Sequence, residues 1–437
     1  MPESSLGEPI QKRLSPLEVF LEASRCLYCY DAPCIQACPT HIDVPGFIGK
    51  IATGDMLGSA RTIMDANAVG ASCARVCPTE QLCEGACVYQ HQETPIRIGD
   101  LQRYATDWLI DHDEVELFSA GAPTGRRVAI VGAGPAGLAA ARDLRRKGHD
   151  VTIFESRAEA GGLDTYGIVP FRLPVDVALW EARQVAKMGV EMRLGTRVGT
   201  DVSPQELLAN YDAVVIALGM GSVPKLGIQG EDLPGVWDAL DFIERAKLGK
   251  PIEKLGNRVA VIGAGNTAID AATCSRRLSA ESVTMYYRRG PDEMTAYQFE
   301  VEFAKSEGVE FRFHAVPIRI LERNGRVGAI EFLRAKPGAR SAKLETIPGS
   351  EFAVEADTIV RAIGQRRLLP LLDDFGVRHD GSVAIVNDDF QTSNPKVFCA
   401  GDIVFRSGTT DAMVVVAAQQ GKLAARAIDG LLSAGGS

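Results

Sequence analysis

The same local pattern occurs twice in this chain: a short β-branched run, then a glycine-rich turn, then an alanine-rich stretch. The two copies begin with the nearly identical segments Arg127–Gly132 and Arg258–Gly263. An apolar strand that ends in such a turn and leads into a helix is typical of α/β units with a parallel sheet. The duplication therefore predicts two α/β units in a chain of 437 residues, a length that suits about three domains.

Composition narrows the class of protein. Hydrophobic residues make up 46% of the chain, which is enough for sizeable cores, and the formal net charge of −9 disfavours a nucleic-acid binder. No apolar run approaches the ~20 residues that span a bilayer, and the polar stretch Met1–Leu14 lacks the apolar core of a secretory signal. We therefore expect a cytoplasmic protein that binds neither nucleic acid nor membranes.

The first glycine-rich turn has the spacing of a dinucleotide-binding loop. Gly132, Gly134 and Gly137 would provide a tight turn, close approach of the backbone to a pyrophosphate, and close helix packing. The next predicted strand ends in Glu155, an acid placed to accept a hydrogen bond from a ribose hydroxyl. This context favours a dinucleotide site over the alternative, a turn that serves packing alone.

The second turn differs at two informative positions. Ala268 replaces the third glycine, and alignment of the strands that follow puts Tyr287 at the position of Glu155. The acid that would repel a 2′-phosphate is thus missing, and Arg288 and Arg289 follow directly. The pattern predicts NADP(H), with NADH and a solvated pair of arginines as the alternatives.

Cysteines are concentrated near the N-terminus, where residues 15 to 115 have helical periodicity. Of ten cysteines, eight lie between Cys26 and Cys87. In a reducing compartment such a cluster indicates metal binding rather than disulfides. The short spacings allow several thiolates to converge on one iron–sulfur cluster while another points to a second, and structural zinc is the alternative. The eight are Cys26, Cys29, Cys34, Cys38, Cys73, Cys77, Cys83 and Cys87.

The chain lacks the close cysteine pair that a flavin disulfide reductase needs. Cys274 and Cys399 each stand alone and are expected to be small buried side chains. If the chain binds a flavin, electrons must therefore leave that flavin by another route.

Three further segments resemble the two-dinucleotide flavoproteins. Ala217–Gly219 and Ala362–Gly364 match the paired strand ends where the chain crosses between domains, and Thr392–Asp402 matches the late FAD motif. This resemblance implies FAD at the first turn and nicotinamide at the second. The FAD residues would be Gly132, Gly134, Pro135, Ala136, Gly137, Glu155, Gly162, Leu163, Arg172, Gly401, Asp402 and Thr410. The NADP residues would be Gly263, Gly265, Asn266, Thr267, Arg288, Arg289, Ala362 and Gly364.

The cysteine segments make the resemblance more specific. Arg25–Pro39, Cys73–Cys87 and Pro95–Arg103 are similar to the N-terminal region of dihydropyrimidine dehydrogenase, above all to the FAD and iron–sulfur subunit of the bacterial enzyme. The glutamate synthase small subunit is the next relative. The resemblance implies two [4Fe–4S] clusters, one held by Cys26, Cys29, Cys34 and Cys87, the other by Cys38, Cys77, Cys83 and Gln102.

Two assignments rest on this resemblance alone. Gln102 matches the family's non-cysteine ligand, and the alternative is Cys73 as the ligand with Gln102 on the surface. Arg172, in Phe171–Pro174, would lie near the flavin on its iron–sulfur side, and the alternative is a surface arginine.

The expected fold is α/β, with an N-terminal α-helical iron–sulfur domain followed by a two-dinucleotide-binding (tandem Rossmann-like) flavoprotein. The expected boundaries are 1–120 for the helical domain, 126–240 and 367–437 for a discontinuous FAD domain, and 241–366 for the NADP(H) domain.

The resemblance implies an electron-transfer oxidoreductase. NADPH would reduce FAD, and two [4Fe–4S] clusters would pass electrons to an FMN-containing partner subunit that reduces uracil or thymine. One rival is an NADPH-to-iron–sulfur donor like the glutamate synthase small subunit, and another is a non-enzymatic, zinc-stabilised scaffold.

Overall fold

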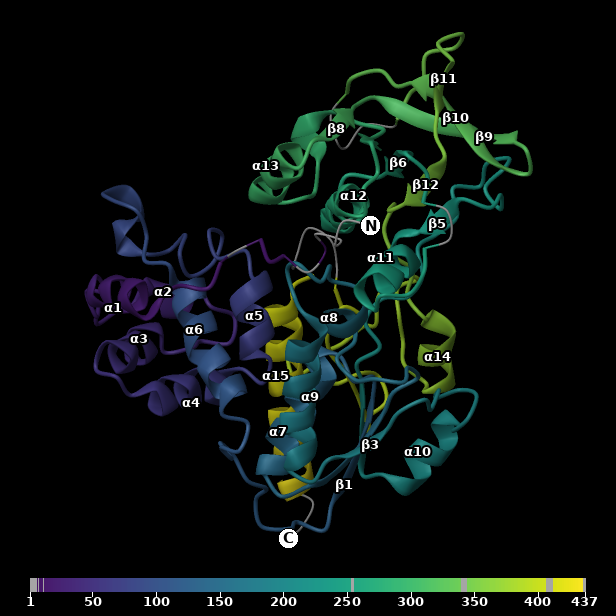
Figure 1. The fold of residues 1–437 in the computed structure, drawn as a ribbon. Helices are drawn as coiled ribbons and strands as arrows, with labels where there is room; N and C mark the ends of the chain where they lie inside the picture. Colours follow the sequence, from purple (N-terminus) through teal and green to yellow (C-terminus); the bar gives the residue numbers. More distant parts are fainter. Residues whose placement is uncertain are drawn as a thin grey trace. The chain divides into compact units, whose positions relative to one another are not determined.

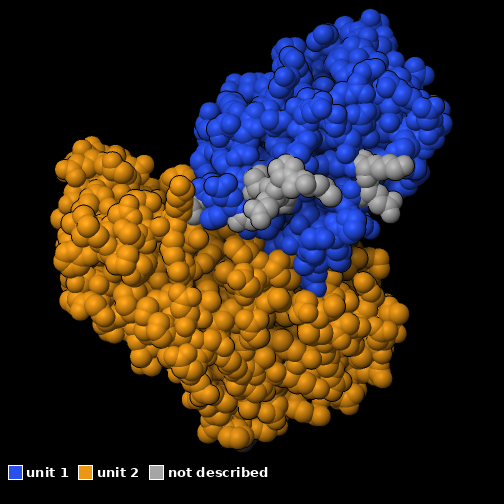
Figure 2. All heavy atoms as spheres, viewed as in Figure 1, with its two compact units in different colours: residues 1–10, 166–171, 221–366 blue, residues 11–165, 172–220, 367–437 orange. Residues whose placement is uncertain are grey.

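The computed structural model describes residues 6, 8–10, 12–252, 255–338, 344–405 and 412–434. The chain divides into two compact units (Figure 2). The inserted unit comprises residues 1–10, 166–171 and 221–366, and the main unit comprises residues 11–165, 172–220 and 367–437. Each unit contains one of the two glycine-rich turns.

The N-terminal part of the main unit, here called the cysteine half (residues 12–112), is built from short helices joined by cysteine-bearing loops (Figure 1). Three of these helices, α1, α3 and α4, start at good capping residues: Ser15 and Glu18 form a capping box, and Asp43 and Asp55 each accept a main-chain hydrogen bond from the first turn. The elements are α1 (Pro16–Ser24), α2 (Pro33–Gln36), α3 (Val44–Ala52), α4 (Met56–Ala66), α5 (Gly70–Val76), the 3₁₀ turn η2 (Val88–His91) and α6 (Ile98–Asp111).

The rest of the main unit, the sheet half, is a parallel five-stranded sheet in the order β13-β4-β1-β2-β3. Its central strands are nearly continuous apolar runs, as expected for strands buried on both faces. The strands are β1 (Arg127–Val131), β2 (Asp150–Phe154), β3 (Glu191–Arg193), β4 (Ala213–Ile216) and β13 (Val397–Cys399). The helices are α7 (Pro135–Arg146), α8 (Leu163–Tyr166), α9 (Val175–Lys187), α10 (Pro204–Asn210), α14 (Leu369–Asp374) and α15 (Val414–Ala434).

The C-terminal part of the chain completes the sheet half. Strand β13 pairs with β4, and helix α15 packs along α7 (Figure 1). The approach is close because Gly421 has no side chain: a Cβ there would lie 2.0 Å from the carbonyl oxygen of Ala136. A helix was expected to start near Thr410, which lies outside the described residues, and α15 begins at Val414.

The inserted unit repeats this arrangement. Its parallel sheet has the order β5-β12-β6-β7-β8. The segment of chain that connects β8 to β12 forms a separate antiparallel sheet, in the order β11-β10-β9. The strands are β5 (Val236–Asp238), β6 (Arg258–Ile262), β7 (Ser282–Tyr286), β8 (Val309–Arg312), β9 (Ala315–Arg323), β10 (Arg326–Arg334), β11 (Phe352–Glu355) and β12 (Thr358–Arg361). The helical elements are α11 (Ala239–Lys247), α12 (Asn266–Arg277), the 3₁₀ turn η3 (Pro291–Glu293) and α13 (Gln298–Ser306).

The sequence duplication thus corresponds to two sheets in which four strands occupy equivalent places. The fifth strand differs, since it is β13, the last strand of the first sheet in chain order, and β5, the first strand of the second. The expected boundaries differ at three places, because residues 1–10, 166–171 and 221–240 belong to the inserted unit and not to the domains in which they were expected. For residues 221–240 the reason is a non-local pairing: β5 forms a parallel ladder with β12, in which Val236 pairs with Ile359. Likewise, residues 11–120 share one compact unit with the first sheet.

The described helices were also compared with the length and apolarity that a bilayer requires. None of them meets both requirements for crossing a membrane.

Candidate functional site

The first glycine-rich turn is shaped by contacts that only glycine permits. Gly132 has φ 107°, and a Cβ there would lie 2.4 Å from the carbonyl oxygen of Ala217 at the end of β4. A Cβ at Gly137 would lie 2.0 Å from the carbonyl oxygen of Gly132. The turn therefore fits tightly against the sheet and leads directly into α7, whose N-terminus can receive a phosphate group.

A second glycine pair faces this turn. Gly162 has φ 58°, and a Cβ there would approach the Cα of Gly134 to 2.8 Å. Glu155 ties the turn to the end of β2, since its Oε2 accepts a hydrogen bond from the amide of Ala133 at 2.9 Å and its Oε1 accepts one from the amide of Arg157 at 2.8 Å. If these glycines had side chains, the side chains would fill the space that a diphosphate needs. The buried carboxylate of Glu155 beside this space retains lone pairs that can accept a hydrogen bond from a ribose hydroxyl. The residues therefore fit the diphosphate and ribose of FAD.

The other residues expected at FAD lie in the same unit. Gly401 donates its amide proton to Oε1 of Gln420 on α15, with an N–O distance of 2.8 Å. Burial raises the pKa of Asp402 to about 6, although Arg367 opposes this shift. Pro135 and Ala136 begin α7, Leu163 begins α8, and Thr410 lies outside the described residues.

Arg172 lies close enough to Glu80 to interact with it electrostatically. Glu80 stands between Cys77 and Cys83 in the sequence. This neighbour puts Arg172 on the side of the sheet half that meets the cysteine half.

The second glycine-rich turn has the same steric relationship to its own sheet. A Cβ at Gly263 would lie 2.2 Å from the carbonyl oxygen of Ala362 at the end of β12, and Gly364 has φ 99°. Asn266 begins α12, and its Oδ1 accepts a hydrogen bond from the amide of Tyr297 at 3.1 Å. The residues expected at NADP, including Gly265 and Thr267, all lie within the inserted unit.

Strand register supports the alignment of the two turns. Phe154 pairs with the last residue of β1, and Tyr286 pairs with the last residue of β6. The residues that follow, Glu155 and Tyr287, therefore occupy equivalent positions, as the alignment predicted. Tyr287 directs its hydroxyl to the carbonyl oxygen of Glu293, at 3.0 Å.

The two arginines after Tyr287 differ in their surroundings. Arg289 forms an ion pair with Glu293, with Nη1 and Oε1 3.2 Å apart, and its side chain is 18% exposed. Arg288 is exposed, and among the described residues no hydrogen bond or ion pair engages it. Arg288 is thus the more available guanidinium for a 2′-phosphate.

The cysteines surround two separate cavities. The first is lined by Cys26, Cys29, Cys34 and Cys87, the set expected for one cluster, within apolar walls that include Ile48. Burial raises the pKa of the Cys34 thiol to about 12, so metal binding has to displace its proton.

The second cavity is lined by Cys38, Cys77, Cys83 and Gln102, the other expected set, and also by Cys73. Gln102 donates its side-chain amide to the carbonyl oxygen of Gly70 at 2.8 Å, which leaves the amide oxygen as its remaining ligand atom. The thiol of Cys73 accepts a hydrogen bond from Nδ2 of Asn67 at 3.2 Å. Both candidates for the eighth ligand are therefore at the cavity.

All ten cysteines are free thiols. Among the residues that the structure describes, no three Cys, His, Asp or Glu side chains lie close enough together to hold a single metal ion. The thiols are arranged around a space in each cavity, and this donor set fits iron–sulfur clusters.

No motif marks two residues that contribute to the second cavity, one by lining it and one by holding α5. Val415 on α15 lines the second cavity, although it lies more than 300 residues from the cysteines. Glu181 on α9 accepts hydrogen bonds from the start of α5, and no motif marks it.

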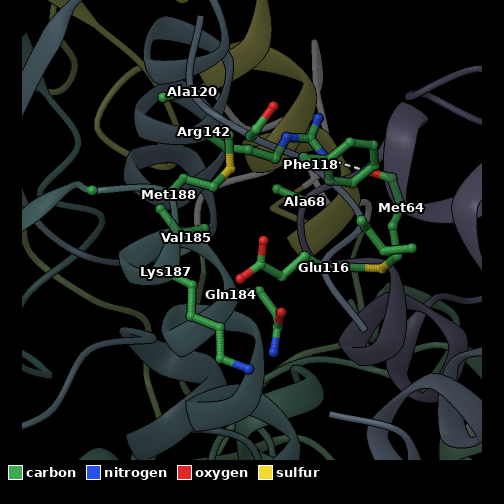
Figure 3. A pocket seen from close by; sticks show the side chains of 13 residues that line it. Met64, Ala68, Glu116, Phe118, Ala120, Arg142, Gln184, Val185, Lys187 and Met188 are labelled. Carbon is green, nitrogen blue, oxygen red and sulfur yellow. Dashed lines mark hydrogen bonds between the residues drawn. The ribbon is translucent and has the colours of Figure 1, made fainter. Parts of the chain in front are cut away.

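A larger cavity of about 300 Å³ lies elsewhere in the main unit, between α4, α7, α9 and residues 116–120 (Figure 3). Its cations are engaged: Arg142 donates to the carbonyl oxygens of Met64 and Asp65, and Lys187 donates to that of Asp113. Apolar side chains such as Phe118 form much of its wall. We assign it no cofactor.

Two families match the sequence. Residues 5–114 match the family described as dihydropyrimidine dehydrogenase domain II, 4Fe-4S cluster. Residues 126–421 match the family described as pyridine nucleotide-disulphide oxidoreductase. The boundary between the two matches falls between the cysteine half and β1.

Similar proteins extend over almost the whole chain. The NAD-dependent dihydropyrimidine dehydrogenase subunit PreT of Escherichia coli K12 is 36% identical over 433 residues, which cover 98% of each chain. The glutamate synthase [NADPH] small chain of the same strain is also 36% identical, over 94% of this chain and 90% of its own.

Solved structures share the two-sheet fold of the second family. FprA from Mycobacterium tuberculosis in complex with NADPH has a TM-score of 0.56 at 21% identity, covering 71% of this chain and 85% of its own. Thioredoxin reductase from T. acidophilum has a TM-score of 0.55 at 23% identity, covering 70% of this chain and 98% of its own.

The glycine-lined cradles, the two cysteine cavities and the matches agree with one another. In this chain a [4Fe–4S] domain of the dihydropyrimidine dehydrogenase type precedes a domain of the pyridine nucleotide-disulphide oxidoreductase family. The chain therefore belongs to that oxidoreductase family and is an NAD(P)H-dependent flavin and iron–sulfur electron-transfer oxidoreductase.

Proposed function

We propose that this chain carries electrons from NADPH, through FAD and two [4Fe–4S] clusters, to an FMN-containing partner subunit that reduces uracil or thymine in the cytoplasm. The observation that carries the proposal is the pair of cysteine cavities, each lined by one complete set of expected ligands, in the same unit as the FAD cradle. The subunit PreT, similar over 98% of both chains, supports the named substrate class and the partner.

When bound, FAD would supply hydride acceptance from the nicotinamide, and the clusters would supply one-electron transfer. The chain's residues bind and orient these groups. The turn at Gly132–Gly137 and the carboxylate of Glu155 hold FAD, and the turn at Gly263–Ala268 holds the nicotinamide nucleotide.

The two cavities differ in their surroundings, which suggests an order of use. The second cavity is walled on one side by Val415 of α15, which packs on the FAD-binding helix α7. Arg172 and its neighbour Glu80 lie at the same junction. This cavity is therefore the one that receives electrons from the flavin.

The first cavity lies beneath apolar side chains that face solvent. Leu27 and Val88 line it and are 58% and 41% exposed. Leu17, Phe20 and Leu21 follow one face of α1 and are 53–67% exposed. Exposed apolar side chains mark interaction sites, so we propose that the partner subunit binds at these five residues, named the exit face.

The preferred nucleotide is NADPH because Arg288 is exposed and no described residue pairs with it, so it can pair with a 2′-phosphate. The similar proteins do not decide this point, since PreT is named NAD-dependent and the glutamate synthase small chain is named for NADPH. NADH is the alternative donor.

A second candidate is an NADPH-to-iron–sulfur donor of the glutamate synthase type. It is favoured by 36% identity to that small chain and by the arginines after β7. A neutral Gln102 in the second cavity favours the pyrimidine dehydrogenase candidate, because the family resemblance implies a glutamine ligand there in pyrimidine dehydrogenases and a glutamate in the glutamate synthase small subunit.

Anaerobic mixing tests the two candidates. The purified holoprotein is combined with NADPH and uracil, with and without the FMN subunit encoded in the same genome. NADPH oxidation that requires both uracil and the subunit supports the pyrimidine dehydrogenase proposal. If NADPH bleaches the flavin but uracil is never reduced, that proposal is wrong, and glutamine with 2-oxoglutarate and the large glutamate synthase subunit is tested next.

A further inference from the structure

A buried carboxylate joins the sheet half to the cysteine half. Glu181 on α9 is 1% exposed. It accepts hydrogen bonds from the amides of Ala71 and Ser72 at 2.7 and 3.0 Å, and from the hydroxyl of Ser72. These three donors all belong to the first turn of α5, so a single side chain fixes the start of this short helix.

Helix α5 in turn shapes the second cysteine cavity. It contains Cys73 and is followed directly by Cys77, whose amide donates to the carbonyl oxygen of Cys73 at 3.0 Å. The carbonyl oxygen of Gly70, the first residue of α5, accepts the hydrogen bond that orients Gln102. Glu181 therefore contacts no expected ligand but holds the element that positions two of them.

The carboxylate also brings a charge into this region. Burial raises the pKa of Glu181 to about 7, while the hydrogen bonds from α5 and the charge of Arg75 oppose this shift. Arg75 is already paired with the buried Asp107 of α6, so it does not by itself cancel the charge of Glu181. Above this pH the region carries a buried negative charge, which disfavours the addition of an electron nearby.

We propose that Glu181 is a positioning residue that fixes α5 and lowers the reduction potential of the cluster held in the second cysteine cavity. This inference rests on the ligand set proposed for that cavity. It gives the first acceptor after the flavin a lower potential than its ligands alone would set.

Reduction potentials of the holoprotein test this inference. Wild type, E181Q, E181D and D176N are titrated at pH 8, where Glu181 is ionised, and each cluster is followed by electron paramagnetic resonance. Asp176 is a matched control, since it is an exposed acid on the same helix. In E181Q we expect the ratio of reduced to oxidised second cluster, at a fixed ambient potential, to rise about tenfold, or ~59 mV for one electron.

The other variants separate charge from packing. E181D keeps the charge but withdraws it by one methylene, so its potential is expected between those of wild type and E181Q, and D176N is expected to match wild type. If E181Q fails to hold its clusters, the reduction potential of the second cluster in E181D decides alone: a potential above that of wild type supports the inference.

Unchanged potentials in the Glu181 variants would overturn the inference, as would an equal shift in D176N. A wild-type chain with only one cluster signal would overturn it together with the ligand set. Failure of uracil reduction alone would affect only the proposed partner and substrate.

Discussion

The side-chain amide of Gln102 donates a hydrogen bond to the main-chain carbonyl of Gly70, with an N–O distance of 2.8 Å. Because the amide nitrogen makes this bond, the side-chain oxygen of Gln102 is the atom left to act as a ligand in the second cavity. An oxygen ligand of no charge in place of a thiolate removes one negative charge from a cluster and shifts its potential.

Replacement of Gln102 distinguishes the two candidates for the eighth ligand. We expect Gln102→Ala to change the electron paramagnetic resonance signal of one cluster, because a ligand is lost. Cys73→Ala should leave both signals intact, since Cys73 is then only a buried side chain bonded to Asn67. The opposite pattern would assign the ligand to Cys73.

The two arginines after β7 should contribute unequally to nucleotide preference. Arg288→Ala is expected to raise the KM for NADPH about tenfold, at ~1.4 kcal/mol per decade, and to leave the KM for NADH unchanged. Arg289→Ala removes the ion pair with Glu293 and should affect both nucleotides alike. Steady-state kinetics with each nucleotide measure this, and an unchanged NADPH/NADH ratio in both variants would contradict a 2′-phosphate site.

Two glycines of α15 provide a matched pair for FAD binding. Gly421→Ala places a methyl group 2.0 Å from the carbonyl oxygen of Ala136 and must push α15 away from α7. We expect a lower flavin-to-protein ratio after purification. Gly430→Ala meets no atom within 4 Å and should retain flavin, with a gain in helix stability of up to ~1 kcal/mol. Equal flavin contents would show that this contact does not control FAD retention.

The exit face can be tested by adding charge. Leu21→Glu introduces a charged side chain at a position that is 57% exposed. Uracil-dependent NADPH oxidation with the partner subunit should fall about tenfold or more, since a charge in an apolar interface core is costly. Reduction of ferricyanide by the chain alone should not change. Leu194→Glu, at 39% exposure outside the exit face, is the control, and an equal loss in both variants would argue against this docking surface.

The raised pKa of Glu181 should make the free energy of unfolding depend on pH. The ordinary pKa of 4.5 is raised to about 7 in the folded protein, so between these values the folded state holds a proton that the unfolded state has released. Stability from this group is therefore greatest at low pH, falls as pH rises towards 7, and is level above it. Between pH 5.5 and 8 we expect wild type to lose about 2 kcal/mol relative to E181Q.

Thermal unfolding of both proteins across this range measures the difference in Tm. If the plots of Tm against pH for wild type and E181Q run parallel, the raised pKa of Glu181 is contradicted. D176N should run parallel to wild type, because Asp176 is exposed.

Sequence alone was sufficient for features set by local sterics. The turn glycines are fixed by backbone contacts such as that of Gly137 with Gly132, and the position of Tyr287 follows from the equal lengths of two strands. The residues around each cysteine cavity also match the sets that the family resemblance implied. In these cases the constraint lies within a motif or in its spacing.

Features set by distant partners were not predictable. The pairing of Val236 with Ile359 moves residues 221–240 into the inserted unit. Glu293 engages Arg289 but leaves Arg288 exposed, which the sequence did not distinguish. Glu181 has no motif at all, because its role depends on a helix that lies more than 100 residues earlier in the chain.

The separation of β4 from its neighbour β13 also affects how the protein is made. β4 ends at Ile216 and β13 begins at Val397. At about 5–20 residues per second, a ribosome needs roughly 10–40 s to synthesise the intervening chain. All eight clustered cysteines emerge before this interval, while Val415, which walls the second cavity, emerges after it. The nascent chain thus leaves the second cysteine cavity open to iron and sulfide delivery until its last helix arrives to close it.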